Sequence, residues 1–187
     1  MVASLFLNSY TSHYADRNSS SPVTDIVLSN TRAYDVDGLF IAGIILFSLF
    51  ILVWCIRYPA QAPYILKSLA TFIIIRAIFM SLTHIAPFPD NIITNPTWIM
   101  SKFSFWADLF FSGHTGMPFL MALIFWHKKW LRYLFILASL IFGTVVLLGH
   151  LHYSIDVLAA FFITYTIHHI CMYIRKQDKI HFQHIPY

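Results

Sequence analysis

The stretch LFIAGIILFSLFILVWCI at residues 39–56 contains no charged side chain. A membrane-spanning helix needs about 20 predominantly apolar residues, because in hydrocarbon every backbone N–H and C=O must be paired within the segment. The whole chain has the same character: of its 187 residues 58% are hydrophobic and 11% are charged, and its mean hydropathy is +0.68. This composition predicts an integral membrane protein built from helices.

Four more apolar runs follow, at about 64–83, 110–126, 130–149 and 153–174. Together the runs predict an all-α, polytopic membrane helix bundle of about five transmembrane helices. Prolines at positions 87, 89 and 96 break helical structure, so we expect one long loop between the second and third runs, with a short interfacial helix around 98–105. The two cysteines, Cys55 and Cys171, lie in or beside apolar runs, so the sequence suggests neither a disulfide framework nor a cysteine zinc site.

Basic residues gather at one end of the predicted bundle, which sets its expected orientation. With five spans, one side carries Arg57, Lys67, Lys128, Lys129, Arg132, Arg175, Lys176 and Lys179. Cytoplasmic loops accumulate Lys and Arg, so we expect an external N-terminal tail and interfacial segment over 1–37, a membrane catalytic bundle over 38–175 and a cytoplasmic tail over 176–187. This asymmetry accounts for the net charge of +4, and no nucleic-acid surface is indicated.

Two motifs open the third and fifth runs, FFSGHT at 110–115 and HLHYSID at 150–156. Both helices are predicted to begin on the external side, so the two motifs can meet at one membrane face. His152 and Asp156 are four positions apart and share a face if the helix has begun by 152. The carboxylate then orients the imidazole and leaves its other nitrogen free to attack as a nucleophile.

The SGHT segment predicts an anion site beside that nucleophile. Ser112 is a favourable N-cap, and Gly113 lets the backbone approach a ligand closely. The following helix start, through Thr115, offers N–H donors and a positive dipole end to a phosphate. His114 lies where it can protonate an oxygen that leaves phosphorus. The sequence thus predicts three catalytic residues, His114, His152 and Asp156.

Other interpretations of these residues stay open. Interfacial histidines and helix caps can be purely structural, and an aspartate in an apolar span is costly unless it is paired or functional. A metal could in principle take His114, His150, His152 and Asp156 as ligands, although an H-x-H pair at a helix start diverges around the axis. A transporter could line a pathway with polar side chains, but here the ionisable residues gather at one membrane face.

FFSGHT and HYSIDVLAAFFIT closely resemble two signature segments of the sphingomyelin synthases, within the membrane phosphatidic acid phosphatase superfamily. Weaker similarity covers RAIFMSLTHIAPFPD at 76–90 and PVTD at 22–25. The resemblance implies a six-helix fold, of which this chain shows five predicted spans, and a metal-free, cofactor-free triad of His114, His152 and Asp156 on the exoplasmic face. It implies transfer of phosphocholine from a phospholipid donor to a lipid-alcohol acceptor through a phosphohistidine. Here Leu151 replaces an acidic residue typical of the family.

Two further residues are expected to contact the substrate. Arg76 lies about eight residues inside the second run, and so deep a cation needs a partner such as the substrate phosphate. Asp108, with neighbouring aromatic residues, is expected to hold a quaternary ammonium group or to cap a helix. The phosphatase branch of the superfamily usually has an arginine six positions before the nucleophilic histidine, where this chain has Val146. This difference favours diester transfer, with hydrolysis by water as the alternative.

Overall fold

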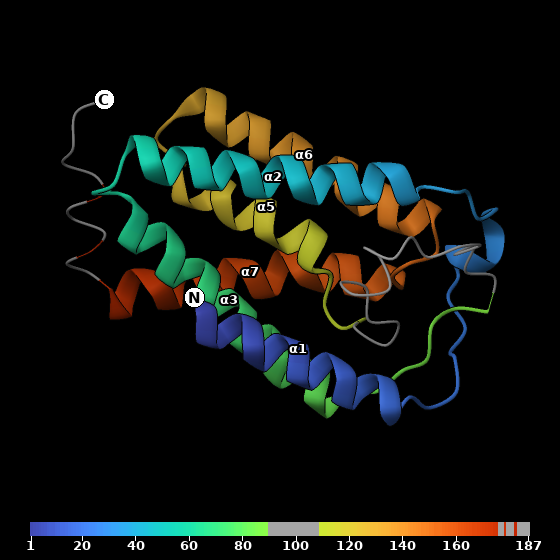
Figure 1. Cartoon of the computed structure of the whole chain (residues 1–187). Coiled ribbons are helices and arrows are strands. Elements are labelled where there is room, and N and C mark those ends of the chain that lie inside the picture. The colour runs from blue at the N-terminus through green and yellow to red at the C-terminus, as the bar shows by residue number, and fades with distance from the viewer. Residues whose placement is uncertain (90–108, 176–177, 179–181, 183–187) are drawn as a thin grey trace.

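The computed structural model describes residues 1–89, 109–175, 178 and 182, and all regular secondary structure within these residues is helical. Figure 1 shows a bundle of long helices with short connections at one end and longer ones at the other. In chain order the elements are α1 (Val2–Arg17), the 3-10 turn η1 (Leu28–Asn30), α2 (Asp37–Arg57), α3 (Ala62–Leu82), α5 (Gly113–Ile124), α6 (Lys129–Leu148) and α7 (Ser154–Ile174).

Four of the described helices are long and apolar enough to cross a membrane: α2, α3, α6 and α7. Their bounds differ by at most two residues from the predicted runs. Many large apolar side chains point outward from them, for example Leu46 of α2 at 66% exposure and Phe162 of α7 at 75%. A surface of this kind suits lipid rather than water. The all-α membrane bundle predicted from composition is confirmed.

The third predicted run forms α5, which is shorter than expected and central. It begins only at Gly113, after the Ser112 cap, and has 12 residues, so its length is about 18 Å at the helical rise. It packs against α6, α7 and α3, and most of its side chains are buried, including Leu120 and Met121 at 0% exposure. Because neighbouring helices surround it, α5 needs no long lipid-facing surface of its own.

Residues Val2–Arg17, in the segment expected to be an N-terminal tail, form helix α1. Figure 1 shows α1 lying along the C-terminal half of α3, and the two helices are in extensive contact. The buried face of α1 consists of small residues, Ser4, Thr11, Ser12 and Ala15. Small side chains allow close helix packing, and the hydroxyls of Ser4 and Thr11 donate to carbonyls of their own helix. This interface has no apolar run, so hydropathy did not reveal it.

The helix ends that carry the two sequence motifs lie toward the same end of the bundle. In Figure 1 the N-terminal ends of α5 and α7, the start of α2 and the C-terminal ends of α3 and α6 all lie toward the right of the view. The segment 18–36 also runs there. The motifs, 35 or more positions apart in sequence, are therefore brought together by topology.

Candidate active site

The SGHT segment forms a tightly capped helix start. The Ser112 Oγ accepts hydrogen bonds from the Thr115 backbone N at 3.4 Å and from the Thr115 Oγ1 at 3.2 Å. Both side chains have 0% exposure. The predicted N-cap is thus present, and the Thr115 hydroxyl donates its hydrogen bond to the Ser112 hydroxyl. This segment can bind a ligand through its backbone N–H groups, because those in the first turn of a helix have no intrahelical partners.

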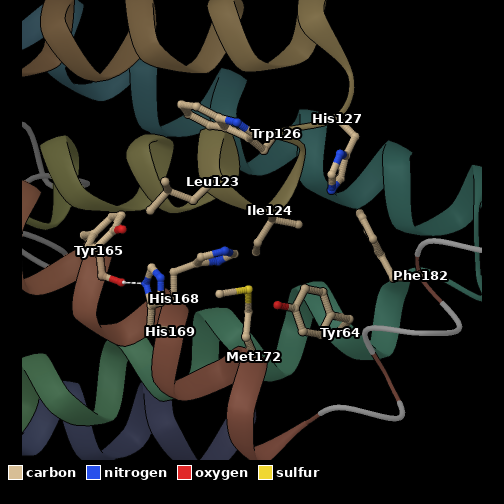
Figure 2. A pocket seen from close by; sticks show the side chains of 10 residues that line it. All are labelled: Tyr64, Leu123, Ile124, Trp126, His127, Tyr165, His168, His169, Met172 and Phe182. Atoms are coloured by element: carbon tan, nitrogen blue, oxygen red, sulfur yellow. Dashed lines mark hydrogen bonds between the residues drawn. The ribbon is translucent and has the colours of Figure 1, made fainter.

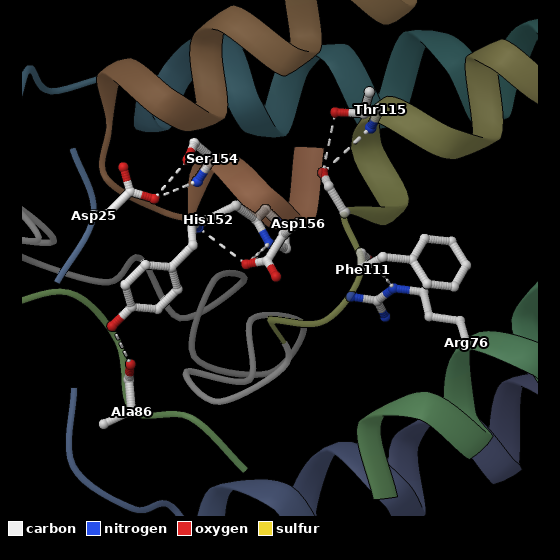
Figure 3. Close-up of polar contacts among 10 residues, drawn as sticks. Asp25, Arg76, Ala86, Phe111, Thr115, His152, Ser154 and Asp156 are labelled. Atoms are coloured by element: carbon white, nitrogen blue, oxygen red, sulfur yellow. Dashed lines mark hydrogen bonds and ion pairs between the residues drawn. The ribbon is translucent and has the colours of Figure 1, made fainter. Parts of the chain in front are cut away.

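His152 and Asp156 approach each other through a capping turn, not through a shared helix face. Helix α7 begins at Ser154, so His152 precedes it by two residues. The Asp156 Oδ2 accepts a hydrogen bond from the Tyr153 N at 2.9 Å as part of a capping box, and it lies 3.6 Å from the His152 Nδ1. The two side chains are 6% and 2% exposed. The His152 Nδ1 has no hydrogen-bond partner among the described residues, so the carboxylate is its close polar neighbour at ion-pair rather than hydrogen-bond distance (Figure 3).

His114 and His152 lie on the same side of the bundle, with ring centroids 6.5 Å apart and ring planes inclined by 56°. The His114 ring also packs on Phe40 of α2 at 3.9 Å, and its Nε2 is buried with no hydrogen-bond partner among the described residues. Groups that react in line need to approach within about 3–3.5 Å. Two imidazoles at this separation can therefore both reach one small group placed between them.

A backbone hydrogen bond ties the two motifs together. The Ser112 N donates to the Asp156 backbone O at 3.2 Å. The start of α5 is thereby held directly against the first turn of α7. The relative positions of His114 and His152 follow from this contact and from the packing of α5 on α7.

Arg76 supports the loop that precedes α5. Its side chain comes from α3 and is 7% exposed. The guanidinium Nε donates to the Phe111 O at 2.8 Å (Figure 3). The Nη1 donates to the Asn8 Oδ1 of α1 at 3.4 Å. A Cβ on Gly113 would come within 3.3 Å of the Arg76 Nε. The absence of a side chain at position 113 thus lets this cation lie directly beside the helix start.

Asp25, in the weakly matching PVTD segment, takes part in the site in a way the sequence analysis did not assign. Its Oδ2 accepts from the Ser154 N at 2.7 Å and from the Ser154 Oγ at 2.8 Å, while its Oδ1 accepts from the Val27 N at 2.8 Å and the Leu28 N at 3.1 Å. Burial alone would raise the pKa of Asp25, but these hydrogen bonds hold the pKa below its ordinary value of 3.8. An ionised Asp25 therefore caps α7 beside His152.

Further contacts make residues 20–36 a strap across the start of α7. The Tyr153 hydroxyl donates to the Ala86 O at 2.8 Å and accepts from the Val23 N at 3.3 Å. The Tyr34 N donates to the Leu148 O at 2.8 Å. We call residues 20–36 the strap below. The strap contacts Leu148 before His152 and Tyr153 after it, so it lies along the loop that carries His152.

His150 occupies a structural position in that loop. Its φ of 53° is left-handed, and it follows the α6 C-cap Gly149. The Leu151 N donates to the Val146 O at 2.9 Å and the His150 N to the Leu147 O at 3.1 Å, which is the Schellman pattern of helix termination. The ring lies toward the strap, with its Nε2 3.4 Å from the Thr31 Oγ1. The His150 ring also packs against Phe88, with the ring centroids 5.3 Å apart.

The remaining predicted residues divide into two groups. Asp108 and the expected helix around 98–105 lie outside the described residues. Among the residues that are described, no group of three or more histidine, cysteine or acidic side chains is close enough to hold a metal ion, so the four ligands considered in the sequence do not assemble. Val146, at the position where phosphatases usually have arginine, is 0% exposed and packed in the bundle.

Comparison with known families places this geometry in context. The family model described as PAP2 superfamily C-terminal matches residues 107–173. This match supports the phosphatidic acid phosphatase superfamily. It covers α5, α6, the loop before α7 and all but the last residue of α7, and so includes His114, His152 and Asp156. Comparison with curated proteins and with solved structures finds no match. The superfamily match supports a lipid phosphatase or phosphotransferase type of function in an integral membrane protein.

Proposed function

We propose that this protein is a lipid phosphotransferase that resembles the sphingomyelin synthases. It moves a phosphocholine-like head group from a glycerophospholipid to a lipid hydroxyl. The observation that carries the proposal is the approach of the His114 and His152 rings to 6.5 Å, with the Asp156 carboxylate 3.6 Å from His152. This is the arrangement that a nucleophile, its orienting group and a general acid require.

The first half-reaction transfers the head group to the enzyme. Asp156 faces the Nδ1 of His152, which leaves the Nε2 to attack phosphorus. The new N–P bond forms as the bond from phosphorus to the diacylglycerol oxygen breaks, and His114 donates its proton to that departing oxygen. Backbone N–H groups at the start of α5, with the Arg76 guanidinium alongside, stabilise negative charge on the phosphoryl oxygens.

The second half-reaction reverses these roles. His114, now unprotonated, takes the proton of an acceptor hydroxyl, and the acceptor oxygen attacks phosphorus. The N–P bond breaks, so His152 regains its electron pair and His114 regains its proton. The protein ends each cycle unchanged, and neither a metal nor a cofactor takes part in the proposed steps.

The charge near the site supports a diester rather than a monoester as the transferred group. Arg76 is the arginine that borders the SGHT segment in the described part of the chain. A phosphomonoester dianion bears about twice the charge of a diester head group at neutral pH and needs more cations to hold it. One guanidinium and a helix start match the single charge of a phosphodiester.

Product analysis tests the proposal. The purified full-length protein is reconstituted in vesicles that contain phosphatidylcholine labelled in its choline group, with and without ceramide, and the lipids and water-soluble products are separated by mass. A ceramide-dependent labelled lipid together with diacylglycerol is the expected result. His152→Ala should abolish it, whereas His13→Ala, an exposed histidine on α1, should not.

The alternatives give different products. Release of phosphocholine or free phosphate to water in the absence of any lipid acceptor would identify a hydrolase that uses the same three residues. A chain that makes no product, and whose behaviour is unaffected by His152→Ala, would be a non-catalytic membrane protein, and the proposal would be wrong.

We further propose that the site faces the exoplasmic side and that the C-terminus is cytoplasmic. The excess of Lys and Arg at the opposite end of the bundle supports this orientation. Cysteine replacements at exposed Tyr34 in the strap and exposed Trp130 at the start of α6 provide the test. In intact cells a membrane-impermeant maleimide should label the first and not the second. The opposite pattern would reverse the orientation.

A further inference from the structure

A cavity of about 360 Å³ lies at the end of the bundle opposite the two catalytic imidazoles. Its walls come from the start of α3, the C-terminal end of α5, the turn into α6 and the last part of α7 (Figure 2). His168 lines the cavity, and its distance from Asp156 along α7 is about 18 Å at the helical rise. The cavity is thus separate from the proposed active site, and its volume is within the range of small-molecule sites, about 300–1,000 Å³.

The cavity has an apolar wall and a small number of polar groups that converge on it. Leu123 and Met172 contribute apolar surface. Tyr64 is 2% exposed, its hydroxyl has no hydrogen-bond partner among the described residues, and Figure 2 shows the oxygen facing the hollow beside Met172. A buried hydroxyl left in this state costs free energy, which a polar ligand atom would recover.

Three histidines surround the same hollow. His168 is 8% exposed, while His127 and His169 lie at the open rim. The His169 Nδ1 is 3.0 Å from the Tyr165 O, so that nitrogen carries the proton and donates to the carbonyl. Because its Nδ1 proton is used within α7, neutral His169 offers no N–H donor to a ligand, so the donors considered for an anionic oxygen such as a phosphate are the Tyr64 hydroxyl and the His168 imidazole.

The charge of this end of the bundle favours an anion. The described cations there are Arg57, Lys67, Lys128, Lys129, Arg132 and Arg175. Among the described residues the acidic side chain at this end is Asp178, which pairs with Lys67 at 2.7 Å. The cavity rim also carries Trp126 at 47% and Tyr165 at 53% exposure, and aromatic residues of this kind concentrate where a membrane meets water.

We propose that this cavity binds an anionic phospholipid from the membrane leaflet opposite the active site. The phosphate accepts hydrogen bonds from Tyr64 and His168, and the upper part of an acyl chain lies along Leu123 and Met172. The site recognises the negative head group, so phosphatidic acid binds in preference to zwitterionic phosphatidylcholine. The proposal concerns a surface remote from the triad and does not depend on which reaction the triad catalyses.

Lipid competition on the full-length protein tests this. The protein is reconstituted in nanodiscs with equal amounts of phosphatidic acid and phosphatidylcholine, and the lipid that is retained after release into detergent is measured by native mass spectrometry. We expect phosphatidic acid to be retained about tenfold over phosphatidylcholine, and the variants Tyr64→Phe and His168→Gln each to reduce that preference by about tenfold, the change expected for one hydrogen bond to a charged group.

Tyr173→Phe is the matched control, because Tyr173 is on the same end of α7, is 86% exposed and does not line the cavity. Tyr64→Phe removes a single oxygen atom and keeps the ring, so it decides the question if His168→Gln reduces the melting temperature. Equal retention of the two lipids would overturn the proposal. So would an unchanged preference in Tyr64→Phe, or displacement of the lipid by millimolar inorganic phosphate, which would identify a site for the free anion.

Discussion

Replacement of Asp25 by alanine offers the sharpest test of how the strap builds the site. Asp25→Ala removes four hydrogen bonds at 2.7–3.1 Å, two within the strap and two to Ser154. Loss of the cap on the Ser154 N and loss of the turn bonds to the Val27 and Leu28 N each cost about 1 kcal/mol, and loss of the bond to the Ser154 hydroxyl costs about 1 kcal/mol more. The expected loss of stability is therefore about 3 kcal/mol, or about 6–12 °C in melting temperature for a chain of this size.

The loss should also appear in catalysis. Ser154 follows His152 by two residues, so release of the α7 start shifts the imidazole from the line of attack. We expect the transfer rate, measured well below the melting temperature of the variant, to fall about tenfold, because small displacements of a reacting group are costly. Asp25→Asn keeps one acceptor oxygen and should give an intermediate effect on both measurements.

Asp35→Ala is the matched control. Asp35 is in the same strap, but it is exposed and its Oδ1 accepts from the Asp37 N at 3.2 Å. We expect this variant to change stability by about 0.5 kcal/mol or less. Melting followed by tryptophan fluorescence and initial rates of transfer compare the three proteins. If Asp25→Ala matches Asp35→Ala in both measurements, the strap does not hold the active site, and the reasoning from these four contacts is refuted.

Three more predictions follow from the described contacts. Hydrogen bonds lower the pKa of Asp25, so the stabilisation from its ionised carboxylate is complete above the ordinary pKa of 3.8 and is lost as the pH falls through the lower folded value. Acid should therefore reduce the melting temperature of the parent protein more than that of Asp25→Ala. Asp156→Asn keeps an acceptor for the Tyr153 N but removes the charge beside His152, so stability should change by less than about 1 kcal/mol while the transfer rate falls by about 10²-fold or more. A Cβ on Gly116 would come within 2.7 Å of the Phe72 ring, so Gly116→Ala should cost about 1–3 kcal/mol in thermal unfolding, whereas Gly38→Ala, with nothing within 4 Å, should cost less.

The long helices were predictable because the bilayer imposes their length. The predicted run 39–56 compares with Asp37–Arg57 for α2, and 130–149 compares with Lys129–Leu148 for α6. Hydrocarbon requires an uninterrupted apolar segment of this size, and few other structures do. The N-cap role of Ser112 was equally predictable, because a serine just before a helix can accept a hydrogen bond from a backbone N–H group of the first turn.

Helix α1 was missed because its interface depends on size rather than on hydropathy. The hydroxyls of Ser4 and Thr11 donate to carbonyls of the preceding turn, so these two residues can lie against α3 without an apolar face. A pattern of hydrophobic residues cannot report such packing. The strap was missed for a related reason, since the partners of Asp25 are mostly backbone N–H groups, and no sequence motif identifies those.

The first turn of α7 explains why both carboxylates belong to the site. Asp156 caps the turn from inside through the Tyr153 N, and Asp25 caps it from the strap through the Ser154 N. Negative charge at a helix start is stabilised by the helix dipole and by such donors, and hydrogen bonds hold the pKa of Asp25 below its ordinary value although its side chain is buried. The Asp156 carboxylate lies 3.6 Å from the His152 Nδ1, while Asp25 accepts hydrogen bonds from the Ser154 hydroxyl and from backbone N–H groups. The surroundings of His152 therefore include two acids that are far apart in the sequence: Asp156 lies beside its ring, and Asp25 holds the backbone two residues after it.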